Sequence, residues 1–107
     1  MFLDGVRVVE LTEALAGPYC AMLLGDLGAE VIKVESPSHM DWWRGAGLQG
    51  TADGPKLYEQ SPTFNTVNRN KYGIALELTH PRGRELFREL VRVSDVLVAN
   101  YPLRSLR

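Results

Sequence analysis

The sequence predicts an α/β fold with a parallel, Rossmann-like sheet flanked by helices. Short apolar runs rich in β-branched residues recur along the chain, as is typical of strands covered on both faces. Segments with helical spacing separate these runs, which is the order expected of parallel strands joined by helical crossovers. With 107 residues, 45% hydrophobic and 23% charged, the chain can form one domain with a modest core.

The first predicted unit is a strand, a helix and a second strand within residues 6–35. Val6–Leu11 (VRVVEL) is a nearly continuous apolar strand. Pro18 suits the first turn of a helix, where its missing N–H has no partner to lose, and Gly28 suits the C-terminal cap. Val31–Val34 is a second buried strand, so the segment forms a βαβ unit with a right-handed crossover.

The helix after Pro18 is predicted to bury a stripe of apolar residues at 3.6-residue spacing. The stripe consists of Tyr19, Met22, Leu23 and Leu27, widened by Cys20 and Leu24. Cys20 is the single cysteine, and we expect it to be a buried structural thiol. One cysteine excludes an internal disulfide and favours a reducing compartment.

Residues 36–64 are predicted to be a long loop, because glycines, prolines and Trp42-Trp43 occur there without a helical or strand period. Such a loop is either a functional lid or an insertion. Order returns with a strand over Gly73–Leu78 (GIALEL), although Ala75 and Glu77 are poor strand formers.

A second helix and a last strand complete the predicted fold. Thr79 is the predicted N-cap of the helix, and Pro81 lies in its first turn. The apolar face of this helix comprises Leu86, Phe87, Leu90 and Val91. Asp95–Ala99 (DVLVA) is the last predicted strand, which completes the order β-α-β-loop-β-α-β.

Charge and hydropathy exclude several functions. Twelve basic and 13 acidic residues give a net charge of −1, which provides no basic surface for nucleic acid or an anionic membrane. No apolar run approaches the roughly 18 residues of a membrane span. The first strand begins close to Met1 and leaves no room for a targeting peptide, so we expect a cytoplasmic protein.

The Gly17-Pro18 turn is the first candidate site. A helix N-terminus at the carboxyl end of a strand presents free N–H groups to an anion, although the turn could equally serve packing alone. Glu35, at the end of the second strand, occupies the place of a ribose-binding carboxylate in a nicotinamide site. Because one glycine stands where that site needs three, and proline removes an amide, the sequence disfavours NAD.

Other polar clusters have two interpretations each. Asn68–Lys71 (NRNK) could bind a phosphate or carboxylate, or form a solvated turn. Asn100-Tyr101 follows the last strand and could meet a ligand or form a plain loop. Asp41, Arg44 and the two tryptophans could bind an adenine or acyl group, or form a packed lid. The two histidines are isolated, so we assign no metal site, and no residue is arranged as a nucleophile.

Taken in order, three segments resemble the N-terminal part of the class III CoA-transferases. These segments are GVRVVELTEALAGPYCAMLLGDLGAEVIKVESP, DWWR and VNRNKYGIALELTHPRGRELFRELVRVSDVLVANY. That family includes formyl-CoA, carnitine-CoA and dicarboxylate CoA-transferases, and α-methylacyl-CoA racemase is a close relative. The resemblance runs from Asp4 to Tyr101 and implies that residues 1–107 are a CoA-binding, Rossmann-like segment, incomplete relative to the family.

The resemblance implies that coenzyme A is bound as a substrate, with no covalently bound cofactor. The implied CoA-binding residues are Ala14, Leu15, Gly17, Arg44, Lys71, Leu76, Asn100 and Tyr101. Ala14 and Leu15 would offer main-chain contacts, Leu76 would touch the adenine, and Asn100-Tyr101 would approach the pantetheine or thioester. Ser36 and Thr79 stand where some members have arginine and lysine, so Arg44 and Lys71 are the candidates for neutralising phosphates.

The resemblance also implies that this chain lacks the catalytic residue. Family members transfer CoA between an acyl-CoA and a carboxylic acid through a downstream aspartate, and none of the five aspartates here matches it. We therefore assign no catalytic residue and expect the isolated 107 residues to be inactive. The alternatives are a segment of an acyl-CoA racemase, and a non-catalytic CoA-binding module or truncated remnant.

The resemblance further implies an interlocked homodimer for the full-length protein, or a second polypeptide that supplies the missing part. A chain of this kind would expose core surface when alone, so we expect it to aggregate or to need a partner. The resemblance fades after Tyr101, which would fit a fragment, a truncated product or one subunit of a split enzyme.

Overall fold

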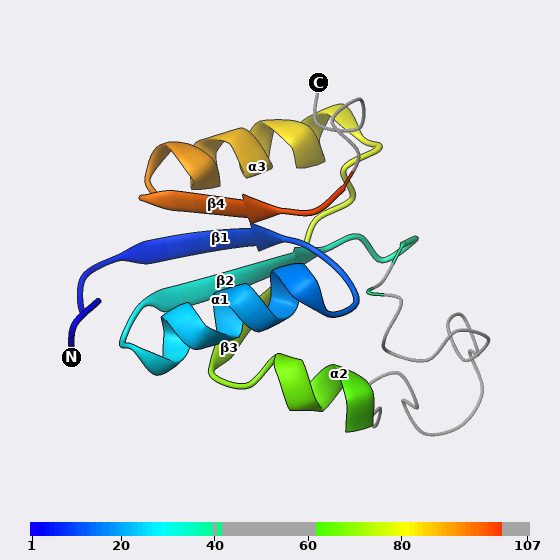
Figure 1. The fold of residues 1–107 in the computed structure, drawn as a ribbon. Coiled ribbons are helices and arrows are strands. Elements are labelled where there is room, and N and C mark those ends of the chain that lie inside the picture. The colour runs from blue at the N-terminus through cyan, green and yellow to red at the C-terminus, as the bar shows by residue number, and fades with distance from the viewer. Residues whose placement is uncertain (40, 42–61, 102–107) are drawn as a thin grey trace.

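The computed structural model describes residues 1–39, 41 and 62–101, and shows a four-stranded sheet covered by helices (Figure 1). The chain runs through seven elements: β1 (Arg7–Leu11), α1 (Ala16–Asp26), β2 (Glu30–Glu35), α2 (Pro62–Val67), β3 (Lys71–Ala75), α3 (Pro81–Arg92) and β4 (Val96–Ala99). The strand order is β3-β2-β1-β4, and every neighbouring pair is parallel. The predicted α/β fold with a parallel sheet is confirmed.

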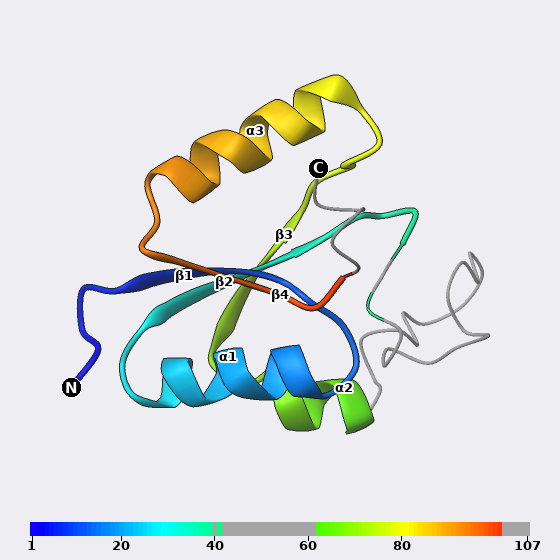
Figure 2. The same cartoon turned by 45° about the horizontal axis from the view of Figure 1, so that its top comes forward.

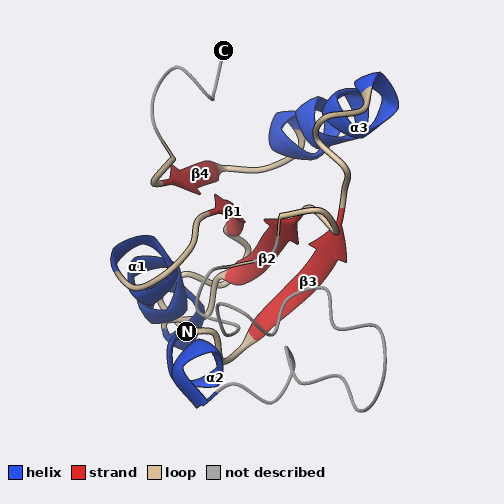
Figure 3. Ribbon diagram, turned by 90° about the vertical axis from the view of Figure 1, so that its right-hand side faces the viewer, coloured by secondary structure: helices blue, strands red, loops and turns tan. Residues whose placement is uncertain are grey.

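Helices cover both faces of the sheet (Figure 2). Helices α1 and α2 lie on one face and α3 on the other, as Figure 3 also shows from the side. Alternate residues of β1 divide between the two layers, since Val8 packs in a cluster with Ala21 of α1, and Val9 packs in a cluster with Phe87 of α3. This division explains why β1 and β2 are apolar on both faces.

The apolar stripe predicted for α1 is confirmed for Met22, which is buried, and for Leu24, which packs against the Val8 cluster, and it is wrong for its other residues. The helix buries Gly17, Pro18, Ala21 and Met22. Tyr19, Leu23 and Leu27 are exposed by 43–47%, and Cys20 is exposed rather than buried. Small residues let the helix lie close to the sheet, so the buried face is set by Gly17 and Ala21 and not by the largest side chains.

Several boundaries differ from the prediction. Strand β3 begins at Lys71, two residues before the predicted start, and ends at Ala75. The N-cap of α3 is His80, whose Nδ1 accepts a hydrogen bond from the Arg82 N–H, 3.1 Å away, whereas the Thr79 hydroxyl donates to Glu77. Helix α2 was not predicted and begins inside the stretch assigned to a loop. Of that loop, residues 40 and 42–61 lie outside the described part.

Phe87, Leu90 and Val91 of α3 pack on the sheet as predicted, while Leu86 is 36% exposed. No helix within the described ranges has the length and apolar character needed to cross a bilayer.

Candidate functional site at the carboxyl edge of the sheet

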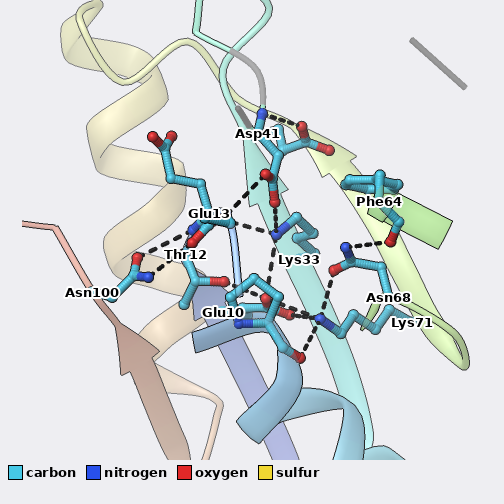
Figure 4. A network of polar contacts seen from close by, with 12 residues as sticks. Glu10, Thr12, Glu13, Lys33, Asp41, Phe64, Asn68, Lys71 and Asn100 are labelled. Carbon is cyan, nitrogen blue, oxygen red and sulfur yellow. Dashed lines mark hydrogen bonds and ion pairs between the residues drawn. The ribbon is translucent and has the colours of Figure 1, made fainter. Parts of the chain in front are cut away.

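The turn after β1 is held by side chains that are distant in sequence. Asn100, directly after β4, accepts a hydrogen bond from the Glu13 N–H at 3.1 Å and donates one to the Glu13 carbonyl at 2.9 Å. Asp41 Oδ1 accepts the Ala14 N–H at 3.0 Å (Figure 4). Ala14 has a φ of +68°, an uncommon conformation for a residue with a Cβ atom. These three hydrogen bonds stabilise the strained turn.

Gly17 allows α1 to approach this turn closely. A Cβ atom at Gly17 would lie 2.6 Å from Thr12 Cγ2 and 3.2 Å from Asn100 Cγ. Glycine is therefore required here for steric reasons, which is the packing role that the sequence left open as the alternative to anion binding. The first turn of α1 therefore packs directly against Thr12 and Asn100 at the carboxyl edge of the sheet.

Beneath the turn lie four buried charged side chains, which we call the charge quartet: Glu10, Lys33, Asp41 and Lys71 (Figure 4). Each is at most 3% exposed at its side chain. Lys33 Nζ lies 2.8 Å from Asp41 Oδ2, 3.3 Å from Glu10 Oε2 and 3.0 Å from the Thr12 carbonyl. Two carboxylates and two ammonium groups balance, which makes the burial of four charges tolerable.

Lys71 completes the charge quartet from β3. Its Nζ lies 2.8 Å from Glu10 Oε1, 3.0 Å from the Pro18 carbonyl and 2.6 Å from Asn68 Oδ1. Burial lowers the pKa of Lys71, and the neighbouring Glu10 acts in the opposite direction. The ammonium group therefore links β1, the start of α1 and the segment before β3, and all of its hydrogen-bond donors are used inside the protein.

Helix α2 covers the charge quartet. Phe64, 8% exposed, places its ring 5.7 Å from Lys33 Nζ, which is within the range of a cation–π contact. Thr12 donates a short hydrogen bond to Glu10 Oε2, so the turn and the quartet share one polar network. A substitution of any member of the charge quartet is therefore expected to alter the conformation of the turn at Ala14.

The NRNK residues do not gather at the carboxyl edge. Asn68, Arg69 and Asn70 precede β3 and Lys71 is its first residue, and the start of a parallel strand lies at the amino edge of the sheet, away from the turn after β1. Arg69 pairs with Asp26 at 2.6 Å and lowers the pKa of that carboxyl, and Asn70 also donates to Asp26. Lys71 reaches the charge quartet with its long side chain, and Asn68 Oδ1 contacts its ammonium group there at 2.6 Å.

A pocket of about 270 Å³ opens at the carboxyl edge, on the α3 side of the turn. Its walls combine apolar side chains with hydroxyl groups, an imidazole and one carboxylate: Leu11, Ser36, Ser38, His39, Glu77, Leu78, Thr79 and Tyr101. The rings of His39 and Tyr101 meet edge to face, with centroids 6.3 Å apart. His39 Nε2 also lies 3.1 Å from Glu13 Oε2, so the pocket adjoins the turn at Glu13 and Ala14.

Glu77 is the one carboxylate among these pocket residues. Its Oε1 accepts hydrogen bonds from Ser36 at 2.7 Å, Ser38 at 2.9 Å and Thr79 at 2.9 Å. These donors, with Ser36 contributing most, lower the pKa of Glu77 to about 2. The side chain is therefore ionised at neutral pH, and the pocket carries a fixed negative charge.

The structure brings most of the predicted site residues to this edge. Ala14, Asn100 and half-buried Tyr101 lie at the turn, and exposed Leu15 directly follows it. Burial and the nearby Glu13 carboxylate raise the pKa of the Tyr101 hydroxyl. Leu76 packs under α3 next to Val9 and Leu11, and Arg44 lies outside the described residues.

Some residues that matter here were missed from sequence. Glu10 and Lys33 are charged residues with an apolar residue on each side in the strand, and this pattern was the signal that could have revealed the charge quartet. Glu77 has no such signal, because three hydroxyl groups from two separate loops define its role. Glu35, considered as a ribose ligand, accepts the Asp41 N–H at 2.8 Å instead.

Comparison with known proteins gives concordant results. The model of CoA-transferase family III matches residues 3–107. The chain is 48% identical over 100 residues to succinyl-CoA:glutarate CoA-transferase of Mus musculus, covering 92% of this chain and 21% of the relative. It is 42% identical over 99 residues to the succinyl-CoA–L-malate CoA-transferase beta subunit of Chloroflexus aurantiacus, covering 92% of this chain and 23% of the relative.

A solved structure of a CAIB/BAIF family protein from Brucella suis superposes with a TM-score of 0.76 at 40% identity. That match covers 96% of this chain and 26% of the other. The chain thus spans about a quarter or less of the length of the relatives it matches.

Proposed function

Because this chain belongs to CoA-transferase family III, we propose that it is the N-terminal, CoA-binding segment of an acyl-CoA:carboxylate CoA-transferase. In this proposal the chain binds CoA, and a carboxylate outside these 107 residues carries the transfer between an acyl-CoA and an acid. The named relatives at 42–48% identity are CoA-transferases, which favours this reaction. The 107 residues alone would then bind CoA without turnover.

One observation supports this proposal most strongly. The turn at Glu13 and Ala14, held by Asn100 and Asp41, adjoins a small pocket at the carboxyl edge of a parallel sheet. Ligands of open α/β sheets bind at that edge. Asp41 holds the Ala14 N–H and fixes the strained backbone, and Leu15, which follows it, is 50% exposed, so CoA can reach the turn at Leu15 without reorganisation of the backbone. We propose that CoA lies along this turn, with Ala14, Leu15, Gly17 and Tyr101 beside it.

The structure suggests separate roles for two other predicted residues. Lys71 has its ammonium group engaged by Glu10, Pro18 and Asn68, so we propose that it supports the turn from below. Asn100 uses both ends of its amide on Glu13, so we propose that it positions the turn that meets the ligand. Arg44 remains a candidate for neutralising the phosphates of CoA.

Gly17→Ala is expected to weaken CoA binding by about tenfold or more. A Cβ would displace Thr12 and Asn100, and Asn100 holds the turn after β1 by its hydrogen bonds to Glu13. Gly73→Ala is the matched control, since a Cβ there meets nothing within 4 Å. Titration calorimetry with CoA on both variants and the wild type measures the effect. Saturable binding that Gly17→Ala leaves unchanged would contradict the assignment of this turn, and a wild type that does not bind CoA would contradict the function.

Helix α1 leaves an apolar stripe uncovered. Leu15, Tyr19, Leu23 and Leu27 follow one another at intervals of four residues and are exposed by 43–50%. A spacing of four places side chains on one face of a helix. We propose that this face is covered in the longer protein, by a second copy in an interlocked homodimer or by another polypeptide, and the beta-subunit relative supports a multi-chain arrangement.

Leu23→Lys combined with Leu27→Lys is expected to reduce association of the chain without lowering its melting temperature, because both residues are already exposed. Light scattering at matched concentrations compares the variant with the wild type. Leu24→Lys is the control, since Leu24 packs against the Val8 cluster and its replacement should destabilise the fold. A wild type that remains monomeric with a sharp thermal transition would contradict this expectation.

A further inference from the structure

Ala14 sets the direction of the chain as it enters α1. Its φ of +68° is left-handed, a conformation that lowers the population of a residue with a Cβ atom by about tenfold. Leu15 follows in the right-handed helical region. Within residues 1–39, 41 and 62–101, the Leu15 N–H forms no hydrogen bond, whereas the Leu15 carbonyl accepts the Tyr19 N–H at 2.8 Å and begins the helix. The conformation of Ala14 therefore determines where the Leu15 N–H points.

Asp41 supports this conformation from a fixed position (Figure 4). Its Oδ1 accepts the Ala14 N–H at 3.0 Å, and its Oδ2 lies 2.8 Å from Lys33 Nζ. The Asp41 N–H donates to Glu35 Oε2 at 2.8 Å, and the residue is 1% exposed. Lys33 and Glu35 both belong to β2, so the strand anchors the backbone of Asp41 and one of its carboxylate oxygens. The other oxygen is thereby held against the Ala14 N–H.

Lys33 lies too deep to contact a ligand. It is 3% exposed, its Nζ is bonded to the Thr12 carbonyl at 3.0 Å, and the Phe64 ring covers it at 5.7 Å. Any effect of Lys33 on ligand binding must therefore pass through its partners. Asp41 is the partner that also bonds to the Ala14 N–H, so the ion pair provides a direct route from the buried charges to the turn.

We infer that Lys33 and Asp41 are positioning residues for ligand binding, which act as one unit to keep Ala14 left-handed and to hold the Leu15 N–H in the direction from which CoA approaches. This inference rests on the proposed function. Neither side chain touches CoA. Lys33 orients the carboxylate, and the carboxylate holds the backbone, so the ion pair specifies a conformation in addition to any contribution to stability.

The test uses glycine at position 14 as a substitute for the ion pair. Asp41→Ala removes the acceptor of the Ala14 N–H and is expected to weaken CoA binding about tenfold. Glycine adopts the left-handed conformation without a steric cost, so adding Ala14→Gly should restore the affinity to within about threefold of the wild type. Ala75→Gly, the same change at an exposed position of β3, is the matched control and should restore nothing.

A second background keeps the test valid if Asp41→Ala does not fold. Lys33→Met combined with Asp41→Leu replaces the ion pair by apolar side chains and leaves Glu10 paired with Lys71, an exchange that buried ion pairs often tolerate. The same two glycine substitutions are then compared in this background, with the same expected result. Titration calorimetry measures the affinity for CoA, and circular dichroism verifies that each variant is folded.

The comparison separates positioning from stability, because both glycine variants carry the same loss of the ion pair. Equal affinities of the Ala14→Gly and Ala75→Gly variants in both backgrounds would overturn the inference. Wild-type affinity in a variant that lacks the ion pair would overturn it as well, and in either case CoA binding by the wild type leaves the proposed function in place. A wild type that does not bind CoA would overturn both.

Discussion

Replacing Lys33 with methionine is expected to remove a large part of the stability of this chain. Lys33 Nζ is paired with Asp41 at 2.8 Å and with Glu10 at 3.3 Å, and its side chain is 3% exposed. Methionine fills a similar volume but leaves two buried carboxylates facing one ammonium group. Breaking a buried ion pair from one side costs about 3–5 kcal/mol, against a total of about 5–15 kcal/mol for a typical domain.

Urea unfolding at neutral pH measures this change as a shift in the transition midpoint. Arg69→Met is the matched control, because Arg69 is 59% exposed at its side chain in its pair with Asp26 and such pairs contribute about 0–1 kcal/mol. A double variant, Lys33→Met with Asp41→Asn, should recover part of the loss, since it also removes a buried carboxylate that has lost its lysine partner. A Lys33→Met variant within about 1 kcal/mol of the wild type would show that the charge quartet is not held together as described.

Gly83→Ala in α3 is expected to destabilise the chain, even though alanine favours helix formation. A Cβ at Gly83 would clash with the Glu77 carbonyl oxygen and lie 2.8 Å from the Glu77 carbonyl carbon. Backbone atoms cannot rotate away, so α3 must shift from the loop that carries Glu77 and Thr79. We expect a loss of about 1–3 kcal/mol in the free energy of unfolding, the usual cost of overpacking.

Gly25→Ala provides the opposite expectation within the same chain. Gly25 lies in α1, and a Cβ there would make only ordinary contacts, the nearest at 3.4 Å from Val31 Cγ2. Because alanine is favoured over glycine in a helix by about 1 kcal/mol, this variant should be as stable as the wild type or more so. Thermal unfolding of both variants tests the pair. A stabilised Gly83→Ala variant would contradict the close approach of α3 to the Glu77 loop.

Local sequence patterns predicted the elements of this fold well. The apolar runs at Val6–Leu11 and Val31–Val34 correspond to β1 and β2, and the crossover between them is helical, as the spacing and Pro18 indicated. Strands of this kind are short and continuously apolar because both of their faces are buried. The ordered motifs also indicated the family, since several segments in sequence carry more information than any one of them.

Patterns within one segment predicted contacts between segments poorly. The largest apolar residues of α1 were expected inside, yet Tyr19 and Leu23 are exposed, because close packing on the sheet is decided by Gly17 and Ala21. The same reasoning placed Cys20 in the core, where the structure leaves it exposed. Helical spacing of large apolar residues identifies the buried face of a helix only when large side chains make the contact with the sheet.

By itself, the sequence determined the α/β class, the parallel sheet and membership of the CoA-transferase family. Only the tertiary structure decided how the candidate site is built. Glu10 and Lys33 become partners because β1 and β2 are neighbours in register, and Asn100 meets Glu13 because β4 ends beside β1. Such pairings depend on strand order and register, which arise from contacts between distant segments and leave no periodic trace along the chain.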